Sequence, residues 1–164
     1  YSCGVNRKPQ SSSLGRSFRM APSAGALYPQ EFYLYCVHSE EIESGIYHFH
    51  PRLRILQQIQ KGDLKNQIMK MVLQPELILG ASLVLFITAV IERLTIKYQD
   101  RGYRYALIES GHVAQNFNLV TTSLGLGSVN IGGFFDNKVD ELLDIDGLTH
   151  STIYMIAVGG KGEN

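Results

Sequence analysis

The segment from Lys97 to Phe135 constrains the fold most strongly, because one stretch of chain predicts a long helix, a glycine-rich turn and a short strand. The helical part, from Arg101 or Gly102 to Leu124, has apolar residues close to helical spacing at Tyr105, Ile108, Val113, Phe117 and Val120. Gly125 and Gly127 then supply a C-terminal stop. The fold must therefore place a long amphipathic helix beside a strand.

Other segments are rich in aromatic and β-branched residues and predict further strands. These segments are Glu31–His38, Gly45–His50, Leu53–Gln60, Leu83–Ile91 and Thr152–Val158. The second and third flank Pro51-Arg52 and predict a hairpin. The fourth is too apolar to face water on either side, which is typical of a central strand.

Two shorter helices are expected, each beginning near an aspartate that can cap its first turn. Asp63 would start a helix that runs to about Leu73 and breaks at Pro75, and Asp136 would cap a helix over Lys138–Leu143. Hairpin-like and crossover-like connections occur together, so the fold class is expected to be α+β rather than a doubly wound parallel sheet. A chain of 164 residues fits a single domain, 1–164.

The charge balance narrows the possible functions. With 15 Lys and Arg against 15 Asp and Glu, no general binding of nucleic acid or of an anionic membrane is expected. The apolar run Leu77–Ile91 is shorter than the roughly 20 residues of a membrane helix. Cys3 and Cys36 lack metal-site or disulfide-framework spacing and suit a reducing, cytoplasmic setting. We expect 6–17 to be a flexible loop, and the start at Tyr1 to be internal to a larger protein.

Two glycine-containing segments could bring backbone close to a ligand. In Pro22–Pro29 the small residues Ser23, Gly25 and Ala26 would let a planar ligand approach, although the segment could equally be a turn into a strand. The glycines of Gly125–Ser128 and Ile131–Gly133 could present N–H groups to a ring nitrogen or a phosphate, or serve only conformation. They follow a helix and lack a third glycine, so they are not a dinucleotide-binding fingerprint.

Several ionisable residues are also candidates for chemistry. Lys97 and Tyr98 can take up a proton if burial or a nearby cation lowers their pKa, or they can belong to a solvated basic helix start, where cations oppose the helix dipole. His48 and His50 share one strand face without a third ligand at suitable spacing, so no metal site is expected. Glu109 could pair with its neighbours His112, Arg104 or Arg101.

The order of these motifs carries a family resemblance. The chain has Pro-Ser-Ala-Gly-Ala-Leu-Tyr-Pro, then Gly-Ile-Tyr-His-Phe with Pro51, Lys-Tyr with Arg-Gly-Tyr-Arg-Tyr-Ala-Leu, Gly-His-Val-Ala-Gln-Asn, Leu-Gly-Leu-Gly-Ser and Ile-Gly-Gly-Phe. From about Arg19 to Gly160 it resembles the SagB-type dehydrogenases, the azoline oxidase branch of the FMN-dependent nitroreductase superfamily.

This resemblance implies a nitroreductase-like α+β fold, with a central mixed or antiparallel sheet flanked by helices, in an intertwined homodimer that binds FMN at its interface. The residues that match flavin-contacting segments are Pro22, Ser23, Ala24 and Gly25 beside the ring, and Ile131, Gly132 and Gly133 at its N5 edge. Lys161, with Arg19 as a weaker candidate, matches the family's basic phosphate contact.

The branch also implies a reaction, the dehydrogenation of thiazoline or oxazoline rings in a precursor peptide, with a cyclodehydratase as a possible partner and dioxygen as oxidant. The reaction requires a base near the flavin, and Lys97 and Tyr98 are the candidates, one as the base and the other as its orienter or proton relay. Ala26 and Tyr28 replace the Asn and Gln of ordinary nitroreductases, and the usual phosphate grip is absent before Tyr1. Two alternatives stay open: an NAD(P)H-dependent nitroreductase or flavin reductase, and a flavin-free scaffold subunit.

Overall fold

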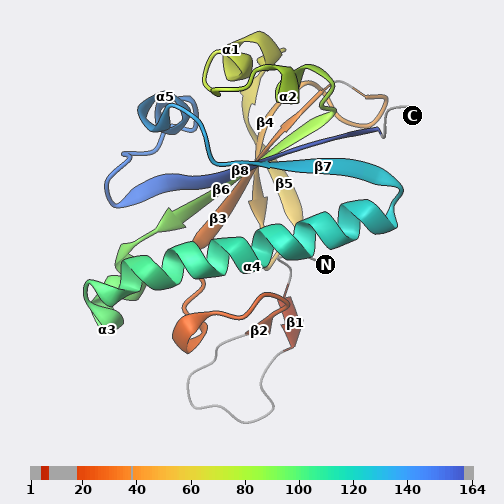
Figure 1. The fold of residues 1–164 in the computed structure, drawn as a ribbon. Coiled ribbons are helices and arrows are strands. Elements are labelled where there is room, and N and C mark those ends of the chain that lie inside the picture. The colour runs from red at the N-terminus through yellow and green to blue at the C-terminus, as the bar shows by residue number, and fades with distance from the viewer. Residues whose placement is uncertain (1–4, 8–17, 38, 161–164) are drawn as a thin grey trace.

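The structure is a computed structural model that describes residues 5–7, 18–37 and 39–160 (Figure 1). Six strands form one sheet in the order β5-β4-β3-β6-β8-β7, with every neighbouring pair antiparallel. These strands are β3 (Gln30–Cys36), β4 (Gly45–His50), β5 (Ile55–Lys61), β6 (Leu83–Val90), β7 (Leu126–Ile131) and β8 (His150–Gly160). A separate pair joins β1 (Val5–Arg7) to β2 (Phe18–Arg19). The predicted α+β class is confirmed.

Helices cover both faces of the sheet. The long helix α4 (Arg101–Ser123) lies along one face, and the short helices pack on the other (Figure 1). The short helices there are α1 (Lys65–Met69), α2 (Glu76–Leu79) and α5 (Asp136–Leu142). The remaining elements, the 3-10 turn η1 (Ala24–Ala26) and α3 (Glu92–Tyr98), lie near the start of α4 (Figure 1).

Two apolar layers separate the sheet from its helices. Alternate residues of β6 point in opposite directions, so Leu85 and Ile87 pack toward α4 while Val84 and Phe86 pack toward the short helices. All four are almost fully buried. This explains why the strand carries no solvated face and confirms that it is central. None of the helices in the described residues is both long enough and apolar enough to cross a membrane.

The first short helix is wrongly predicted beyond Met69. The backbone N–H of Leu73 donates to the Gly133 carbonyl at 2.9 Å, and the Phe135 N–H donates to the Met71 carbonyl at 2.7 Å. This pairing with a distant segment takes up backbone groups that a longer helix would need. Pro75 then precedes α2, so the apolar run from Leu77 begins in a helix rather than a strand.

The long helix α4 begins at Arg101, as predicted, and Lys97 lies in a separate helix, α3, that precedes it. Gln99 has φ 50° and ψ −138°, which ends α3 at Tyr98 before α4 begins at Arg101. A Cβ at Gly102 would lie 2.9 Å from backbone atoms of Leu94 and Thr95, so only glycine permits this close approach of the two helices. Lys97 is therefore in the last turn of α3, where the helix dipole favours a cation, and the predicted opposition to the dipole is wrong for this residue.

Two local expectations also need correction. Asp136 is the first residue of α5 and makes no side-chain cap, because the capping position belongs to Phe135. Within the predicted loop 6–17, Asn6 and Arg7 belong to β1, and 8–17 lies outside the described residues.

Candidate functional site

The segment Pro22–Pro29 forms a tight loop with an unusual backbone. Gly25 has φ 60°, and two residues that carry side chains, Ala26 at 53° and Tyr28 at 47°, also lie in the left-handed region. Such a conformation costs of the order of 1–3 kcal/mol for each residue that is not glycine. Surrounding contacts must therefore hold this loop in shape.

Tyr28 is held at several points. Its backbone N–H donates to Oγ of Ser23 at 2.9 Å, and its carbonyl accepts from Nη1 of Arg93 at 3.2 Å. Its hydroxyl accepts from the backbone N–H of Arg19 at 2.9 Å, while the Arg19 guanidinium carbon lies 4.7 Å from the ring centroid. The loop is thus fastened to α3 and to β2.

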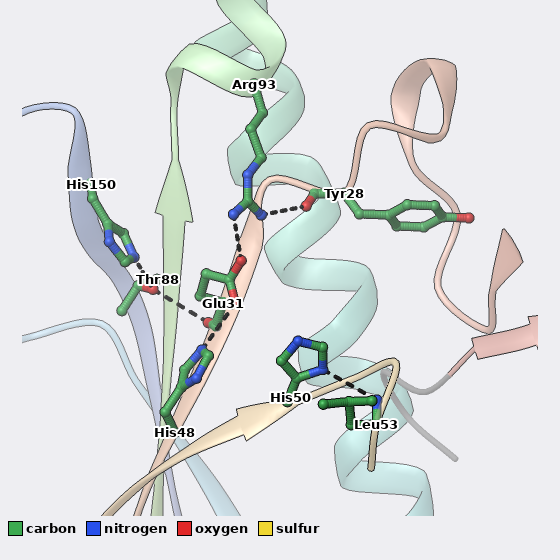
Figure 2. Close-up of polar contacts among 8 residues, drawn as sticks. All are labelled: Tyr28, Glu31, His48, His50, Leu53, Thr88, Arg93 and His150. Carbon is green, nitrogen blue, oxygen red and sulfur yellow. Dashed lines mark hydrogen bonds and ion pairs between the residues drawn. The ribbon is translucent and has the colours of Figure 1, made fainter. Parts of the chain in front are cut away.

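Arg93 connects the loop to a cluster of polar side chains on the sheet (Figure 2). Its Nη2 lies 2.6 Å from Oε1 of Glu31, and the other oxygen of that carboxylate lies 3.0 Å from Nε2 of His48. Burial raises the pKa of Glu31, but the charges and hydrogen bonds of Arg93 and His48 outweigh burial and leave the pKa below its usual value. Thr88 joins the Glu31 carbonyl to His150 in the same cluster (Figure 2).

The loop meets the two predicted catalytic residues at Gly25. A Cβ atom there would lie 2.8 Å from the Tyr98 hydroxyl oxygen and 3.0 Å from Nζ of Lys97. Nζ of Lys97 also lies 5.2 Å from the ring centroid of Tyr98, whose edge packs against Tyr105. Tyr98 is half-buried but Lys97 is exposed, so the described residues do not supply the burial that would lower the pKa of a lysine.

The second glycine segment has a different set of neighbours. A Cβ at Gly133 would lie 3.1 Å from Cδ1 of Leu73, so this glycine allows the 71–73 segment to pack closely. A Cβ at Gly132 would meet only Tyr154, at 3.7 Å, so one side of its backbone is open. Ile131 is buried in the core of the sheet. This segment does not come into contact with Gly25 in the described residues, and Lys161 lies outside them.

Glu109 is a feature of the site that sequence reasoning missed. It is only 4% exposed, and its Oε1 accepts a 2.7 Å hydrogen bond from the backbone N–H of Ala24. The carboxyl therefore points toward the loop rather than pairing with Arg104 or Arg101, while His112 lies near enough to lower its pKa. Its position between Ala106 and Val113 on the apolar side of α4 was the available signal, because a charge on a buried helix face needs a specific partner.

Two hollows lie elsewhere on the molecule. One of about 340 Å³ is lined by the β4–β5 hairpin and the end of α5, and the other of about 270 Å³ lies beside the start of β7 and the end of β8. Neither is lined by Gly25, Lys97 or Gly132, so neither hollow is the predicted site. The described residues contain no group of three His, Cys, Asp or Glu able to hold a metal ion, and His48 is bonded to Glu31.

Comparison with family models matches residues 8–160 to the nitroreductase family. Two curated relatives were found. A protein of Methanocaldococcus jannaschii, provisionally named a nitroreductase, is 42% identical over 130 residues, which are 79% of this chain and 66% of that protein. The microcin B17-processing protein McbC of Escherichia coli is 31% identical over 134 residues, 78% of this chain and 49% of McbC. The chain thus spans less than two thirds of the length of both relatives.

Solved structures show the same fold. A provisionally named nitroreductase from Anabaena variabilis has a TM-score of 0.90 at 29% identity and covers 96% of this chain, which corresponds to 32% of that protein. The Escherichia coli microcin synthetase McbBCD complex, with truncated pro-MccB17 bound, has a TM-score of 0.79 at 27% identity over 99% of this chain and 60% of the matched chain. A Desulfovibrio desulfuricans structure with bound FMN has a TM-score of 0.61 at 18% identity over 88% of this chain and 68% of that one. The predicted nitroreductase-like architecture is confirmed.

Proposed function

Because the chain belongs to the nitroreductase family, we propose that it is an FMN-dependent oxidoreductase that dehydrogenates azoline rings of a precursor peptide to azoles. The observation that carries the proposal is the meeting of Gly25 with Lys97 and Tyr98, which unites the expected flavin loop with the expected catalytic pair. The similarity to McbC, a microcin-processing protein, supports a peptide substrate.

The chemistry of the loop fits a flat isoalloxazine ring. Ser23, Ala24 and Gly25 present small side chains at a partly exposed turn, so the backbone can approach a planar group. The open side of Gly132 leaves its backbone accessible to the polar edge of such a ring. Pro22 and Ile131 would flank these contacts, and Arg19 and Lys161 are the proposed partners of the phosphate.

In this account bound FMN supplies a two-electron acceptor. Conversion of an azoline to an azole removes a proton from one ring carbon and a hydride from its neighbour, which an acceptor of this kind would take up. Lys97 or Tyr98 takes the proton, and the other member of the pair orients it, since Nζ and the tyrosine ring lie together beside Gly25. A lysine is neutral only where water is excluded from its amine. Because Lys97 is exposed in this chain, bound substrate or a second subunit would have to exclude that water.

A homodimer would supply such a second subunit. Leu107, Ile108 and Leu119 lie on the outer face of α4 and are 42%, 49% and 60% exposed. Neighbouring apolar side chains exposed on one helix face are typical of a protein–protein interface. We propose that a second copy covers this face. A charge introduced by Ile108→Glu should convert a dimer to monomer in light-scattering measurements, and a wild-type chain that is monomeric at high concentration would contradict the dimer.

The reaction is tested by incubating the FMN-loaded protein with a peptide that contains thiazoline or oxazoline rings in the presence of dioxygen. We expect a loss of two hydrogen atoms per ring by mass spectrometry. The bound precursor peptide in the McbBCD structure supports adding a cyclodehydratase as a partner in the assay. An unchanged peptide mass with intact bound flavin would contradict the proposed substrate.

A second candidate, an NAD(P)H-dependent nitroreductase or flavin reductase, is favoured by the name of the Methanocaldococcus relative. Rapid loss of flavin absorbance on addition of NADPH, followed by reduction of a nitroarene, would support it. A third, a flavin-free scaffold subunit in the same cytoplasmic pathway, predicts a colourless protein that still binds a precursor peptide. The three candidates therefore differ in flavin content and in electron donor.

A further inference from the structure

A hydrogen bond ties the long helix to the proposed flavin loop. The backbone N–H of Ala24 donates to Oε1 of Glu109 at 2.7 Å, across 85 positions of sequence. The bonded residue is directly followed by Gly25, the point at which the loop meets Lys97 and Tyr98. Any shift at Ala24 would therefore move the loop relative to that pair.

The carboxyl of Glu109 is poorly compensated for its burial. The second oxygen, Oε2, is buried and has no hydrogen-bond partner among the described residues. Desolvation raises the pKa of the carboxyl, and the Ala24 N–H, the side chains of Ser23 and Gln30 and the charge of His112 offset this only in part. A buried, unpartnered carboxylate oxygen opposes folding, because the group loses its hydration without a full replacement.

An apolar side chain at position 109 would stabilise the packing of the helix better than the buried carboxyl of Glu109 does. Neighbouring residues on the same face, Ala106, Val113 and Ala114, pack in apolar clusters. Replacement of buried charged groups by apolar ones is often neutral or stabilising. The contribution of Glu109 is therefore its hydrogen bond to the backbone N–H of Ala24, rather than stability.

We propose that Glu109 is a positioning residue, which fixes the Ala24–Gly25 peptide so that the loop can receive the flavin beside Lys97 and Tyr98. This inference rests on the proposed FMN-dependent function. The part of Glu109 that matters is its hydrogen-bond acceptor, and a neutral amide of the same shape can supply it. Substitution by an apolar residue removes the acceptor and, with it, the hydrogen bond between the loop and α4.

The test compares Glu109→Leu with Glu109→Gln in FMN titrations and thermal unfolding. We expect the leucine variant to bind FMN about tenfold more weakly or worse, since a hydrogen bond to a charged group is lost, while its melting temperature is equal to or above that of wild type. The glutamine variant should bind FMN within about threefold of wild type, because its carbonyl oxygen can accept from Ala24.

Asp140 supplies a matched control. It is a second helix carboxylate that is 4% exposed, and it also accepts one backbone N–H, that of Thr152 at 2.8 Å, but it lies on α5 and does not touch the loop. Asp140→Asn should leave FMN affinity unchanged whatever its effect on stability. A loss of affinity as large as that of Glu109→Leu would show that any buried carboxylate matters, and would overturn the specific role of Glu109.

A second readout keeps this inference separate from the proposed function. Hydrogen exchange at the Ala24 amide of the flavin-free protein should be faster in Glu109→Leu than in wild type and close to wild type in Glu109→Gln. Wild-type protein that fails to bind FMN would overturn the function but would leave this measurement intact. Unchanged exchange in the leucine variant, or FMN affinity equal to wild type, would overturn the positioning role.

Discussion

The hydroxyl oxygen of Tyr98 lies 2.8 Å from the point that a Cβ atom would occupy at Gly25. Lys97 approaches the same point with its Nζ at 3.0 Å. The two segments are far apart in sequence, and their meeting places a candidate base at the backbone of the candidate flavin loop.

Gly25→Ala should disrupt the meeting point. The added methyl would lie too close to Tyr98 and Lys97, and alanine at φ 60° costs about 1–2 kcal/mol of backbone strain. We expect weaker FMN binding and at least a tenfold lower rate of azoline oxidation, measured on protein that remains folded by circular dichroism. The control is Gly62→Ala, where φ is also positive but no atom lies within 4 Å of the new methyl. That variant should lose stability and keep its flavin; loss of flavin in both would point to general strain.

Lys97→Met should separate binding from chemistry. Methionine retains the length of the side chain and removes the ammonium, so FMN should stay bound while azole formation falls by about a hundredfold or more, the usual scale for loss of a general base. Tyr98→Phe should lower the rate with similar retention of flavin. The control is Lys138→Met, because Nζ of Lys138 also lies over an aromatic ring, that of Phe135 at 4.6 Å. That variant should keep both its flavin and its rate of azole formation. Full turnover in Lys97→Met would remove this residue from the mechanism.

The ion pair between Glu31 and Arg93 should stabilise the loop in a pH-dependent way. The pKa of the Glu31 carboxyl lies below its ordinary value of 4.5. The ion pair therefore contributes its full stability above pH 4.5, and this contribution is lost as the pH falls through the lowered pKa. Glu31→Gln should cost about 1 kcal/mol at neutral pH, and the difference from wild type should vanish in acid. Chemical denaturation at several pH values measures this. Glu43→Gln, which breaks an exposed pair with Lys61, should have almost no effect.

Glu109 should show the opposite pH dependence. Desolvation raises its pKa above 4.5, so the folded state binds the proton more tightly than the unfolded state does, and stability falls as pH rises above the ordinary value. Glu109→Gln should therefore gain stability over wild type at neutral pH and show no such gain in acid. A charge on His112 would lower the pKa of this carboxyl, so the same comparison is repeated in proteins that carry His112→Gln. A gain that is independent of pH would contradict the assigned shift.

Much of the fold could be predicted from local pattern. The apolar run in β6, the hairpin of β4 and β5 and the amphipathic spacing of α4 are properties of contiguous residues, and the structure confirms all three. The failures have non-local causes. The early end of α1 depends on pairing with residues 133–135, and the break at Gln99 accompanies the close approach of Gly102 to α3. Neither the pairing with residues 133–135 nor the approach of Gly102 to α3 can be predicted from the residues near these positions in the sequence.

The candidate site was predictable only in part. Motif order identified Gly25, Lys97 and Tyr98, but their proximity arises from the way that α3 and the loop pack, which a linear pattern does not contain. Glu109 was visible as a charge on a buried helix face, yet its partner lies 85 residues away in a loop. The exposure of Lys97 agrees with the alternative of a solvated position, but the sequence did not predict that α3 ends before α4 begins.

The most direct test of the account is an absorbance spectrum of the purified chain after incubation with FMN and removal of unbound flavin. The account predicts that flavin bands remain with the protein, at about one FMN per chain, and that Gly25→Ala weakens this retention. Complete loss of flavin from wild-type protein would contradict the central claim that the loop at Gly25, together with Lys97 and Tyr98, forms part of a flavin site.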